Sequence, residues 1–372
     1  MIAALALFAA LAPGAAPAGT LRIATWNVEL QRRGPGLLLA DIEGGEDPQV
    51  AAAVAVIAEM APDILLLQSF DYDAGLVALR AFARRLEEAG PAYPHLFAFR
   101  PNTGRASGLD LDGDGRLGGP GDAQGFGYFA GQGGMALLSR LPIAAAEARD
   151  FSGFLWRDLP GALLPEKDGA PFPSAEAQAA QLLSTTGHWA VPVELPEGGR
   201  LTLLAWHASP PVFDGPEDRN GRRNHDEAAF WTALLDGRLA EKPPAPPFVL
   251  LGDANLDPVD GDGRGAAIRA LLGHPMLQDL APASAGGAEA ARVQGGPNAT
   301  QRGDPALDTA DWDEARGPGN LRVDYLMPSR DLTVTGAGVF WPGEADPMAA
   351  TVAAASRHRL VWADLETAPG IH

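Results

Sequence analysis

Two polar side chains that could do chemistry stand directly after an apolar run in the last third of the chain. Residues 248–251, Phe-Val-Leu-Leu, have the length and composition of a buried strand, and Gly252 begins the turn that follows. Asp253 and Asn255 are two residues apart, so on an extended backbone both side chains point to one face. A carboxylate there could take a proton from water, and an amide could hold that water or a phosphoryl oxygen. In isolation, Gly-Asp-Ala-Asn is more often an Asx turn, so the hypothesis depends on the rest of the chain.

The elements that must position this turn alternate between strands and helices in the first ninety residues. Residues 21–30 alternate apolar and other side chains as a strand does, with Asn27 near the end. Residues 49–60 have the apolar spacing of a helix that packs on one face. Residues 63–68 form a second apolar run, and residues 74–89 a second helical segment. This order predicts helices covering sheets.

The first eighteen residues contain no charged side chain and have the composition of an export signal. Their apolar run, residues 2–11, is too short to span a bilayer, and Ala16-Pro17-Ala18 is the small-x-small pattern of a cleavage site. We therefore expect a signal peptide over 1–18, a single domain over 19–372, and a secreted or periplasmic protein with no membrane span once the signal is removed. The absence of cysteine fits export without fixing the compartment.

Composition bounds the partners of the chain. The net charge of -19, from 28 Lys and Arg against 47 Asp and Glu, disfavours nucleic acid, because a duplex backbone is approached by basic side chains. Arg222, just before a predicted helix over 226–239, could still bind a substrate phosphate, although a charge at a helix start is the more common reason for such a residue. His188, at the entry of a predicted strand, could face a cleft or simply pack. A monomer is expected.

Several short motifs follow one another along the chain. They are Thr25-Trp26-Asn27-Val28, Asp63-Ile64-Leu65-Leu66-Leu67-Gln68, Gly134-Met135-Ala136-Leu137-Leu138-Ser139-Arg140, His207, Gly252-Asp253-Ala254-Asn255, Arg322-Val323-Asp324-Tyr325 and Ser356-Arg357-His358. In their order and spacing they resemble the endonuclease/exonuclease/phosphatase superfamily, over residues 21–365. The resemblance implies an α+β fold, a four-layer α/β/β/α sandwich of two packed, mostly antiparallel sheets flanked by helices. It also implies a metal-dependent phosphoesterase site at the strand ends.

The same resemblance assigns roles to five polar side chains. It implies that Asp253 polarises the attacking water and that Asn255 positions this water. His358 would contact the phosphoryl oxygens, and Asp324 would hydrogen-bond the far ring nitrogen of His358, which fixes the tautomer and favours the charged form. His207 would be a second phosphate-contacting histidine. These residue types supply an activated water and donors where negative charge builds during phosphoryl transfer.

The chain departs from the family pattern at two positions that serve a divalent cation. The residue expected to be a metal-ligating glutamate is Ser69, and the aspartate of the final Ser-Asp-His motif is replaced by Arg357. Three interpretations follow, in order of preference. Mg²⁺ or Mn²⁺ is held by Asn27 with Glu29, Asp71 or Asp73 filling in; or Arg357 binds the substrate and supplies positive charge where the cation would sit; or the chemistry has been lost.

A second acidic constellation has the spacing of a calcium loop. Asp110, Asp112 and Asp114 stand at the first, third and fifth positions, and Gly115 stands where such a loop turns sharply. The glutamate expected at the twelfth position is a glycine, although Asp122 follows it directly. We predict a structural Ca²⁺ here, because carboxylates this close repel one another without a cation.

Together these features predict a metal-dependent hydrolase of a phosphate mono- or diester, acting on a small-molecule, lipid or sugar phosphate. A secreted nuclease is an alternative within the same class. A non-catalytic binding domain that has lost its cation ligands is the alternative from another class. The five retained polar groups favour the enzyme, because polar groups converge at buried strand ends at a cost. The two lost acidic positions favour the binding domain.

Overall fold

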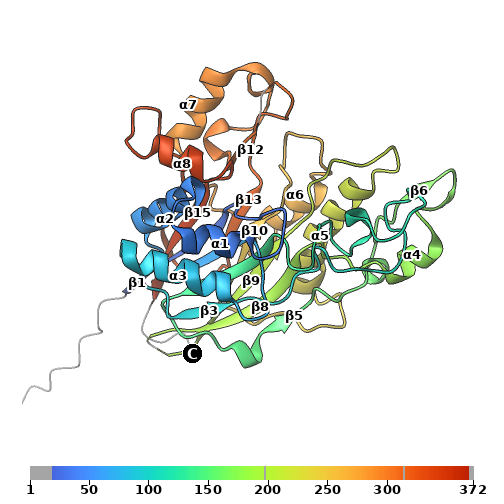
Figure 1. Cartoon of the computed structure of the whole chain (residues 1–372), viewed down its shortest axis with the longest axis horizontal. Helices are drawn as coiled ribbons and strands as arrows, with labels where there is room; N and C mark the ends of the chain where they lie inside the picture. The colour runs from blue at the N-terminus through green and yellow to red at the C-terminus, as the bar shows by residue number, and fades with distance from the viewer. Residues whose placement is uncertain (1–18, 197, 313–314, 368–372) are drawn as a thin grey trace, which may run out of the picture.

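Two sheets packed face to face form the centre of the fold (Figure 1). The structure is a computed structural model that describes residues 19–196, 198–312 and 315–367. The predicted signal peptide, residues 1–18, lies outside this part of the chain. In the part that is described, no helix has both the length and the apolar character needed to cross a membrane.

The first sheet has six strands and the second has five. The first contains β1 (Gly19–Asn27), β2 (Ile64–Phe70), β3 (His95–Phe97), β4 (Gly134–Ser139), β14 (Val334–Phe340) and β15 (Leu360–Thr367), in the order β14-β15-β1-β2-β4-β3. The second contains β5 (Arg149–Asp150), β8 (Gly187–Glu194), β9 (Arg200–His207), β10 (Phe248–Asp253) and β13 (Asp324–Pro328), in the order β13-β10-β9-β8-β5. Neighbours are antiparallel except for the pairs β1–β2 and β10–β9.

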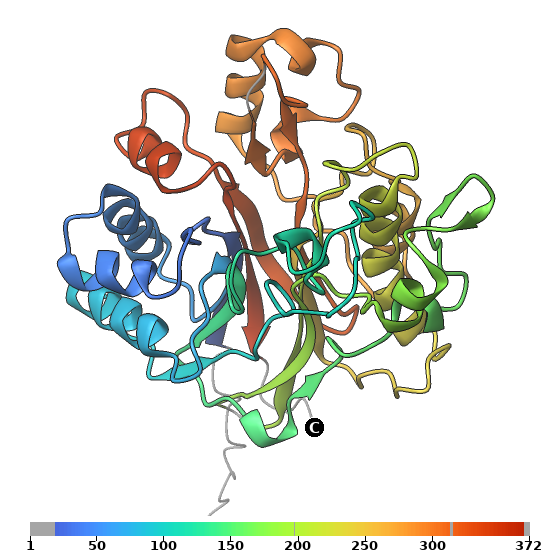
Figure 2. The ribbon, with the colours of Figure 1, turned by 45° about the vertical axis from the view of Figure 1, so that its right-hand side comes forward.

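Helices cover the outer face of each sheet, as the two flanks of Figure 2 show. The first sheet is covered by α1 (Leu37–Gly44), α2 (Pro48–Met60), α3 (Val77–Ala89) and α8 (Ala349–Ala355). The second is covered by α5 (Arg219–Leu235) and α6 (Ala266–Leu272). The remaining elements are α4 (Ala175–Ala180), α7 (Ala285–Gln294), β6 (Glu166–Lys167), β7 (Ala170–Pro171), β11 (Ala310–Asp311), β12 (Asn320–Leu321) and short 3₁₀ turns at Pro120–Asp122, Ala145–Glu147, Trp156–Asp158, Gly296–Ala299 and Pro305–Leu307.

The apolar run of β10 shows why the sandwich has four layers. Val249 and Leu251 point into the core between the sheets, whereas Phe248 and Leu250 point into the core under α5 and α6. All four side chains are fully buried. Burial of each such side chain stabilises the fold by about 1.5–3 kcal/mol. A strand covered on both faces is apolar at every position, as this one is. The two sheets and the helices on their outer faces confirm the α/β/β/α prediction.

Two of the three predicted helices have wrong boundaries, and the third begins one residue before the predicted range. The helix predicted over 74–89 begins at Val77, after Asp73 has accepted hydrogen bonds from the N–H groups of Val77 and Ala78. The helix predicted over 226–239 occupies Arg219–Leu235 instead, so Arg222 lies inside it. The helix predicted over 49–60 begins at Pro48, where the side chain of Asp47 accepts from the N–H of Val50 as an N-cap.

Candidate active site

The register of the strands brings polar residues from both sheets to one place. Asp253, the last residue of β10, pairs with Asp324 at the start of β13 and with His207 at the end of β9. From the first sheet, Asn27 closes β1, and His358 stands just before β15. The indole N–H of Trp26 donates to the carbonyl of His358 at 3.0 Å, which ties the two segments together.

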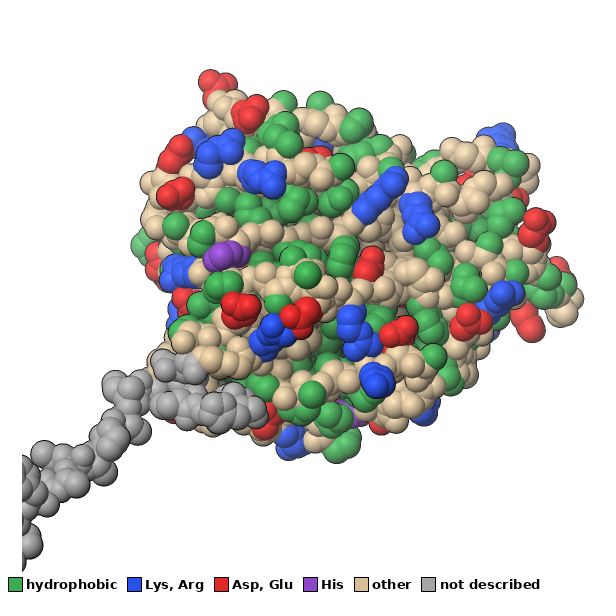
Figure 3. Space-filling view, turned by 90° about the horizontal axis from the view of Figure 1, so that it is seen from below, with side chains coloured by type: hydrophobic (Ala, Val, Ile, Leu, Met, Phe, Trp, Pro, Cys, Tyr) green, Lys and Arg blue, Asp and Glu red, His purple; other side chains and the backbone are tan. Residues whose placement is uncertain are grey.

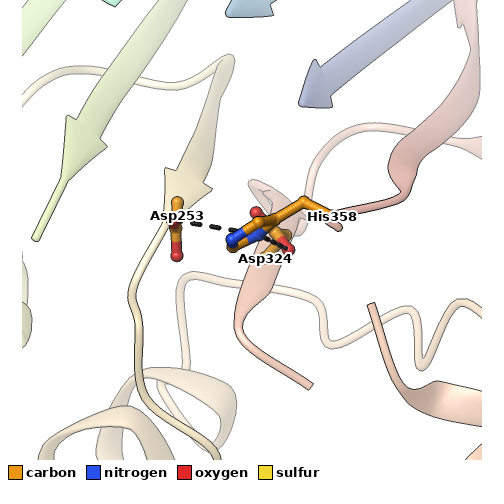
Figure 4. Close-up of side chains that lie close together, drawn as sticks. All are labelled: Asp253, Asp324 and His358. Atoms are coloured by element: carbon orange, nitrogen blue, oxygen red, sulfur yellow. Dashed lines mark hydrogen bonds and ion pairs between the residues drawn. The ribbon is translucent and has the colours of Figure 1, made fainter. Parts of the chain in front are cut away.

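A histidine lies between two buried carboxylates at this meeting point (Figure 4). His358 Nδ1 is 2.9 Å from Asp324 Oδ2 and 4.0 Å from Asp253 Oδ2. Asp324 and Asp253 are fully buried and His358 is 3% exposed. With Nδ1 donating to Asp324, the other ring nitrogen, Nε2, has Asn27 Nδ2 as a neighbour at 3.5 Å.

Asp253 receives several hydrogen bonds. Asn27 Nδ2 donates to Oδ2 at 2.8 Å, and the backbone N–H of Asn255 donates to Oδ1 at 2.7 Å. Asn255 has φ 48°, a left-handed conformation that asparagine tolerates. It therefore does not continue the extended strand, yet its amide still reaches Asp253 Oδ2 at 3.3 Å. His207 Nε2 lies 3.5 Å from the same oxygen.

The environment separates the protonation states of these groups. Burial and the charge of Asp324 raise the pKa of Asp253 to about 7, although His358 and Asn27 act in the opposite direction. Burial opposes the charged form of His358, but Asp324 and Asp253 outweigh it and raise the pKa of His358 to about 9. Burial and the charge of His358 lower the pKa of His207 to about 3. Near neutral pH the site therefore combines a cationic His358, a neutral His207 and a carboxylate poised to exchange a proton.

An ion pair lies on the other side of this cluster. Glu29 Oε1 accepts from Arg357 Nε at 2.9 Å and also from Arg357 Nη2. Glu29 Oε2 accepts from the backbone N–H of Arg357 at 2.8 Å and lies 3.1 Å from Ser356 Oγ, whose hydroxyl also reaches the carbonyl of Asn27 at 2.7 Å. The Glu29 side chain is 16% exposed and the Arg357 side chain 61% exposed. The pair thus lies at the solvent edge of the site, with its carboxylate inward of its guanidinium.

The residues predicted to hold Mg²⁺ or Mn²⁺ are not assembled as a ligand set. Asp71 accepts from the N–H groups of Arg32 at 2.9 Å and Gly133 at 2.8 Å, and burial raises its pKa to about 6. Asn27 directs its amide nitrogen at Asp253, while its oxygen accepts from the N–H of Glu29 at 3.3 Å. With the Glu29 carboxylate paired to Arg357, this donor set does not fit a divalent cation as it stands.

The structure does not place His188 or Arg222 in the cluster. His188 is 1% exposed, its Nδ1 is 2.9 Å from Ser184 Oγ, and its Nε2 is 2.9 Å from the carbonyl of Glu227. With both ring nitrogens taken inside the protein, His188 is a packing residue, and the prediction that it binds substrate is corrected. Arg222 donates through Nε to the carbonyl of Glu217 at 3.2 Å, as a side chain that secures the start of α5.

The predicted calcium loop brings three carboxylates together. Ligand oxygens of Asp110, Asp112 and Asp122 all lie within 4.8 Å of one another. Asp114 is not a member of this group, and its carboxylate accepts from the N–H of Arg116 at 2.7 Å. Asp122, which stands one place beyond the twelfth position, takes the place that the sequence pattern gave to Asp114. The other such group in the described residues is Asp253, Asp324 and His358.

Two residues beside His358 were not found from the sequence. Thr309 is fully buried and donates through Oγ1 to Asp324 Oδ2 at 2.8 Å. Thr309 Oγ1 also accepts from the N–H groups of Val323 and Asp324. The ring of Trp312 stands edge-on to the imidazole of His358, with centroids 5.5 Å apart. Both lie in a segment rich in Gly, Ala and Asp without a clear period, so no sequence signal marked them.

Comparisons with known proteins identify the family and the fold of the chain. The model of the endonuclease/exonuclease/phosphatase family matches residues 24–358. No curated protein sequence gave a significant match. The structure is similar to an endonuclease/exonuclease/phosphatase from Beutenbergia cavernae DSM 12333, with 19% identity and a TM-score of 0.52 over 93% of this chain and 71% of that chain.

Two further solved structures resemble the chain more distantly. Sphingomyelinase C from Streptomyces griseocarneus is 14% identical, with a TM-score of 0.48 over 93% of this chain and 99% of that chain. The human Nocturnin catalytic domain with bound sulfate anion is 16% identical, with a TM-score of 0.46 over 94% of each chain. At these identities the likeness concerns the fold.

Proposed function

Since the chain belongs to the endonuclease/exonuclease/phosphatase family, we propose that it is a hydrolase of phosphate esters. One observation carries the proposal. Asp253, Asp324 and His358 are buried at the strand ends of two sheets, and both carboxylates lie within 4.0 Å of His358 Nδ1. Burying two carboxylates and a histidine costs free energy unless they are paired, and a structural role needs no such group. The arrangement supports an active site better than a binding domain that has lost its chemistry.

Each polar group has a part in the proposed reaction. Asp253 takes a proton from the attacking water, and Asn255, whose amide lies 3.3 Å from that carboxylate, helps to position the water. The water oxygen forms a bond to phosphorus while the bond to the leaving oxygen breaks. His358, charged and aligned by Asp324, donates from Nε2 to a phosphoryl oxygen as charge develops there. His207, neutral, offers a further donor beside Asp253.

The substrate class is proposed from charge. A small-molecule, lipid or sugar phosphate fits a protein with a net charge of -19 better than a nucleic acid does. On the face seen in Figure 3, basic and acidic side chains are interspersed rather than gathered by sign. A secreted nuclease is the alternative within the class. If the protein does not nick plasmid DNA at low ionic strength, this alternative is ruled out. Export and a monomeric state stay predictions.

The experiment that tests the enzyme is hydrolysis of a chromogenic phosphate diester and a monoester, each with Mg²⁺, Mn²⁺, Ca²⁺ or EDTA. We expect turnover of one ester and a drop of about 10³-fold or more in Asp253→Asn, because the general base is removed without a change of shape. A folded protein that cleaves neither ester under any condition contradicts the assignment. So does an Asp253→Asn variant as active as the parent.

A calcium ion in the loop of Asp110, Asp112 and Asp122 is proposed separately. Its support is the proximity of the three carboxylates, within 4.8 Å. Calorimetric titration of the EDTA-treated protein with Ca²⁺ should show one site of millimolar or tighter affinity that Asp112→Asn weakens. Equal heats for the parent and this variant would remove the loop as the site. Because the loop takes no part in the proposed reaction, the esterase activity of Asp112→Asn should differ little from that of the parent.

A further inference from the structure

The ion pair of Glu29 and Arg357 joins a residue predicted to ligate a divalent cation to the residue that replaces an acidic position of the family pattern. Glu29 has φ 51°, a left-handed conformation that is uncommon for a non-glycine residue. Its two carboxylate oxygens accept from Arg357 Nε, Arg357 Nη2 and the N–H of Arg357, and Ser356 Oγ lies 3.1 Å away. A carboxylate with this many donors has no face left for a divalent ion without losing the guanidinium.

The orientation of Asn27 makes the same point independently. A metal ligand must present an oxygen, but the Asn27 amide presents its nitrogen, which lies 2.8 Å from Asp253 Oδ2 and 3.5 Å from His358 Nε2. Its oxygen is turned to the N–H of Glu29 at 3.3 Å. A flipped amide would set an oxygen against the Asp253 carboxylate and a donor against an N–H. The contacts to Asp253 and to the N–H of Glu29 favour this assigned orientation, in which the nitrogen rather than the oxygen faces the carboxylate.

The guanidinium keeps unused donors. Glu29 engages Nε and Nη2, and among the described residues Nη1 of Arg357 has no hydrogen-bond partner. The side chain is 61% exposed, so these donors face solvent. Its neighbour in the chain is His358, whose pKa is raised in part by the charge of Glu29. A guanidinium held by a carboxylate on one edge can still offer its other edge to a phosphate.

We propose that Arg357, aligned by Glu29, is the phosphate-binding cation of this site and replaces a divalent ion held by Asn27 and Glu29. The inference rests on the proposed function and deepens it. Arg357 binds non-bridging oxygens of a phosphate mono- or diester, while His358 and Asp253 act on the far side. The alternative is an ordinary surface ion pair, which would contribute little to stability and nothing to phosphate binding.

The first test measures binding without turnover. The EDTA-treated full-length protein is titrated with inorganic phosphate and the affinity is followed by calorimetry. We expect binding in EDTA that weakens at least tenfold in Arg357→Gln and by an intermediate amount in Arg357→Lys, because lysine cannot present two parallel donors. The matched control is Arg140→Gln. Arg140 is another part-exposed arginine paired to a carboxylate, Asp63 at 3.0 Å. It follows β4 at the end of the first sheet opposite to the site, so its loss should leave phosphate affinity unchanged.

The second test counts bound Mn²⁺ by electron paramagnetic resonance. The parent and Glu29→Gln should bind the same number of ions, whereas Arg357→Asp should gain one, because Glu29 is released and a second carboxylate is added beside it. Thermal denaturation confirms that each variant is folded. The inference is overturned if the parent binds no phosphate in EDTA, if Arg357→Gln binds phosphate as tightly as the parent, or if Glu29→Gln loses one Mn²⁺ relative to the parent.

These outcomes separate the inference from the proposed function. Ester hydrolysis that requires both Mg²⁺ and Glu29 would overturn the role of Arg357 and leave the phosphoesterase standing. Phosphate binding that depends on Arg357 in a protein that hydrolyses no ester would do the reverse. Hydrolysis in EDTA that falls with Arg357→Gln, with the loss mainly in KM, supports both.

Discussion

The two sheets contribute opposite kinds of group to the site. The second sheet supplies Asp253 and Asp324, which are fully buried, and His207, whose side chain is 12% exposed; strand register links all three. The first sheet supplies Asn27 and the part-exposed pair of Glu29 and Arg357. Carboxylates on the second-sheet side lie near a histidine that they keep charged, whereas the carboxylate on the first-sheet side is already neutralised by an arginine.

This difference teaches where the site can change. A buried carboxylate that loses its partner is left as an uncompensated charge, at a cost of about 3–5 kcal/mol, so the second-sheet side must be kept or lost as a unit. At the solvent edge, water screens each charge and an exchange between cation and guanidinium costs little. We therefore expect substitutions to have large effects on the second-sheet side and selective ones on the first-sheet side.

The largest effect expected on this comparison comes from Asp324→Asn. Removing the carboxylate takes away both the acceptor that orients His358 and the main charge that keeps it protonated. We expect kcat to fall about 10²–10⁴-fold with a smaller change in KM. Steady-state kinetics on the active ester would measure it. The control is Asp364→Asn. This change removes the acid of a more exposed ion pair, between Asp364 on β15 and Arg22 on β1, and kcat should stay within about twofold of the parental value.

If Asp324→Asn retained more than a tenth of parental kcat, the buried side would not act as a unit. The comparison would then fail, because the two sides of the site would respond alike.

The pH dependence gives the next effect. Activity needs Asp253 deprotonated and His358 protonated. Because the pKa of Asp253 is raised to about 7 and that of His358 to about 9, kcat/KM should rise as pH increases through about 7 and fall as pH increases through about 9. Each limb should change about tenfold per pH unit, and the two apparent values belong to the cluster as a whole.

The pH profile of Asp324→Asn sharpens this result. Without Asp324, the cause that most raises the pKa of His358 is gone, so the alkaline limb should move to lower pH. Asp324 also raises the pKa of Asp253, so the acid limb should move to lower pH as well. An alkaline limb that stays in place would show that His358 does not carry the essential proton.

The sequence predicted the second-sheet side of the site better than the first. Asp253 stands at the end of an apolar run that marks a buried strand, whereas the α/β/β/α fold that joins it to Asp324 was implied by the resemblance to the family and not by runs such as 248–251 alone. What failed depended on side-chain direction. His188 lies on a strand next to His207, but the alternation of strand side chains turns it into the aromatic core under α5.

Other parts of the site could not be predicted because they depend on contacts between distant segments. Thr309 reaches Asp324 only because residues 309–311 lie along the segment that carries His358, through an N–H of Arg359 that donates to the carbonyl of Thr309 at 2.7 Å. Asp71 was a reasonable ligand by spacing, yet β2 is irregular at Ser69, with φ 55°, and the Asp71 carboxylate accepts from the backbone N–H groups of Arg32 and Gly133, which lie in two different loops.

The smallest effect on kcat is expected at Asp308, an acidic residue that lacks the ion-pair partners found on both sides of the site. Asp308 is 6% exposed, its Oδ2 has no hydrogen-bond partner among the described residues, and burial together with Asp257, Asp260 and Asp304 raises its pKa to about 8. In the unfolded chain this carboxyl loses its proton near its ordinary pKa of about 4, whereas the folded protein retains it to about pH 8. Stability is therefore highest below about pH 4 for this group and is lost as pH rises toward 8.

Asp308→Asn should remove that loss. We expect an increase in the free energy of unfolding of about 1–3 kcal/mol at pH 8, little change at pH 4, and less than about a twofold change in kcat, measured by urea denaturation and steady-state kinetics. Because Asp308 adjoins Thr309, a large fall in kcat would instead mean that its charge acts on the site through Thr309 and Asp324. The buried acids would then form one electrostatic unit extending beyond the strand ends, and the division between the two sheets would no longer describe how the site is held.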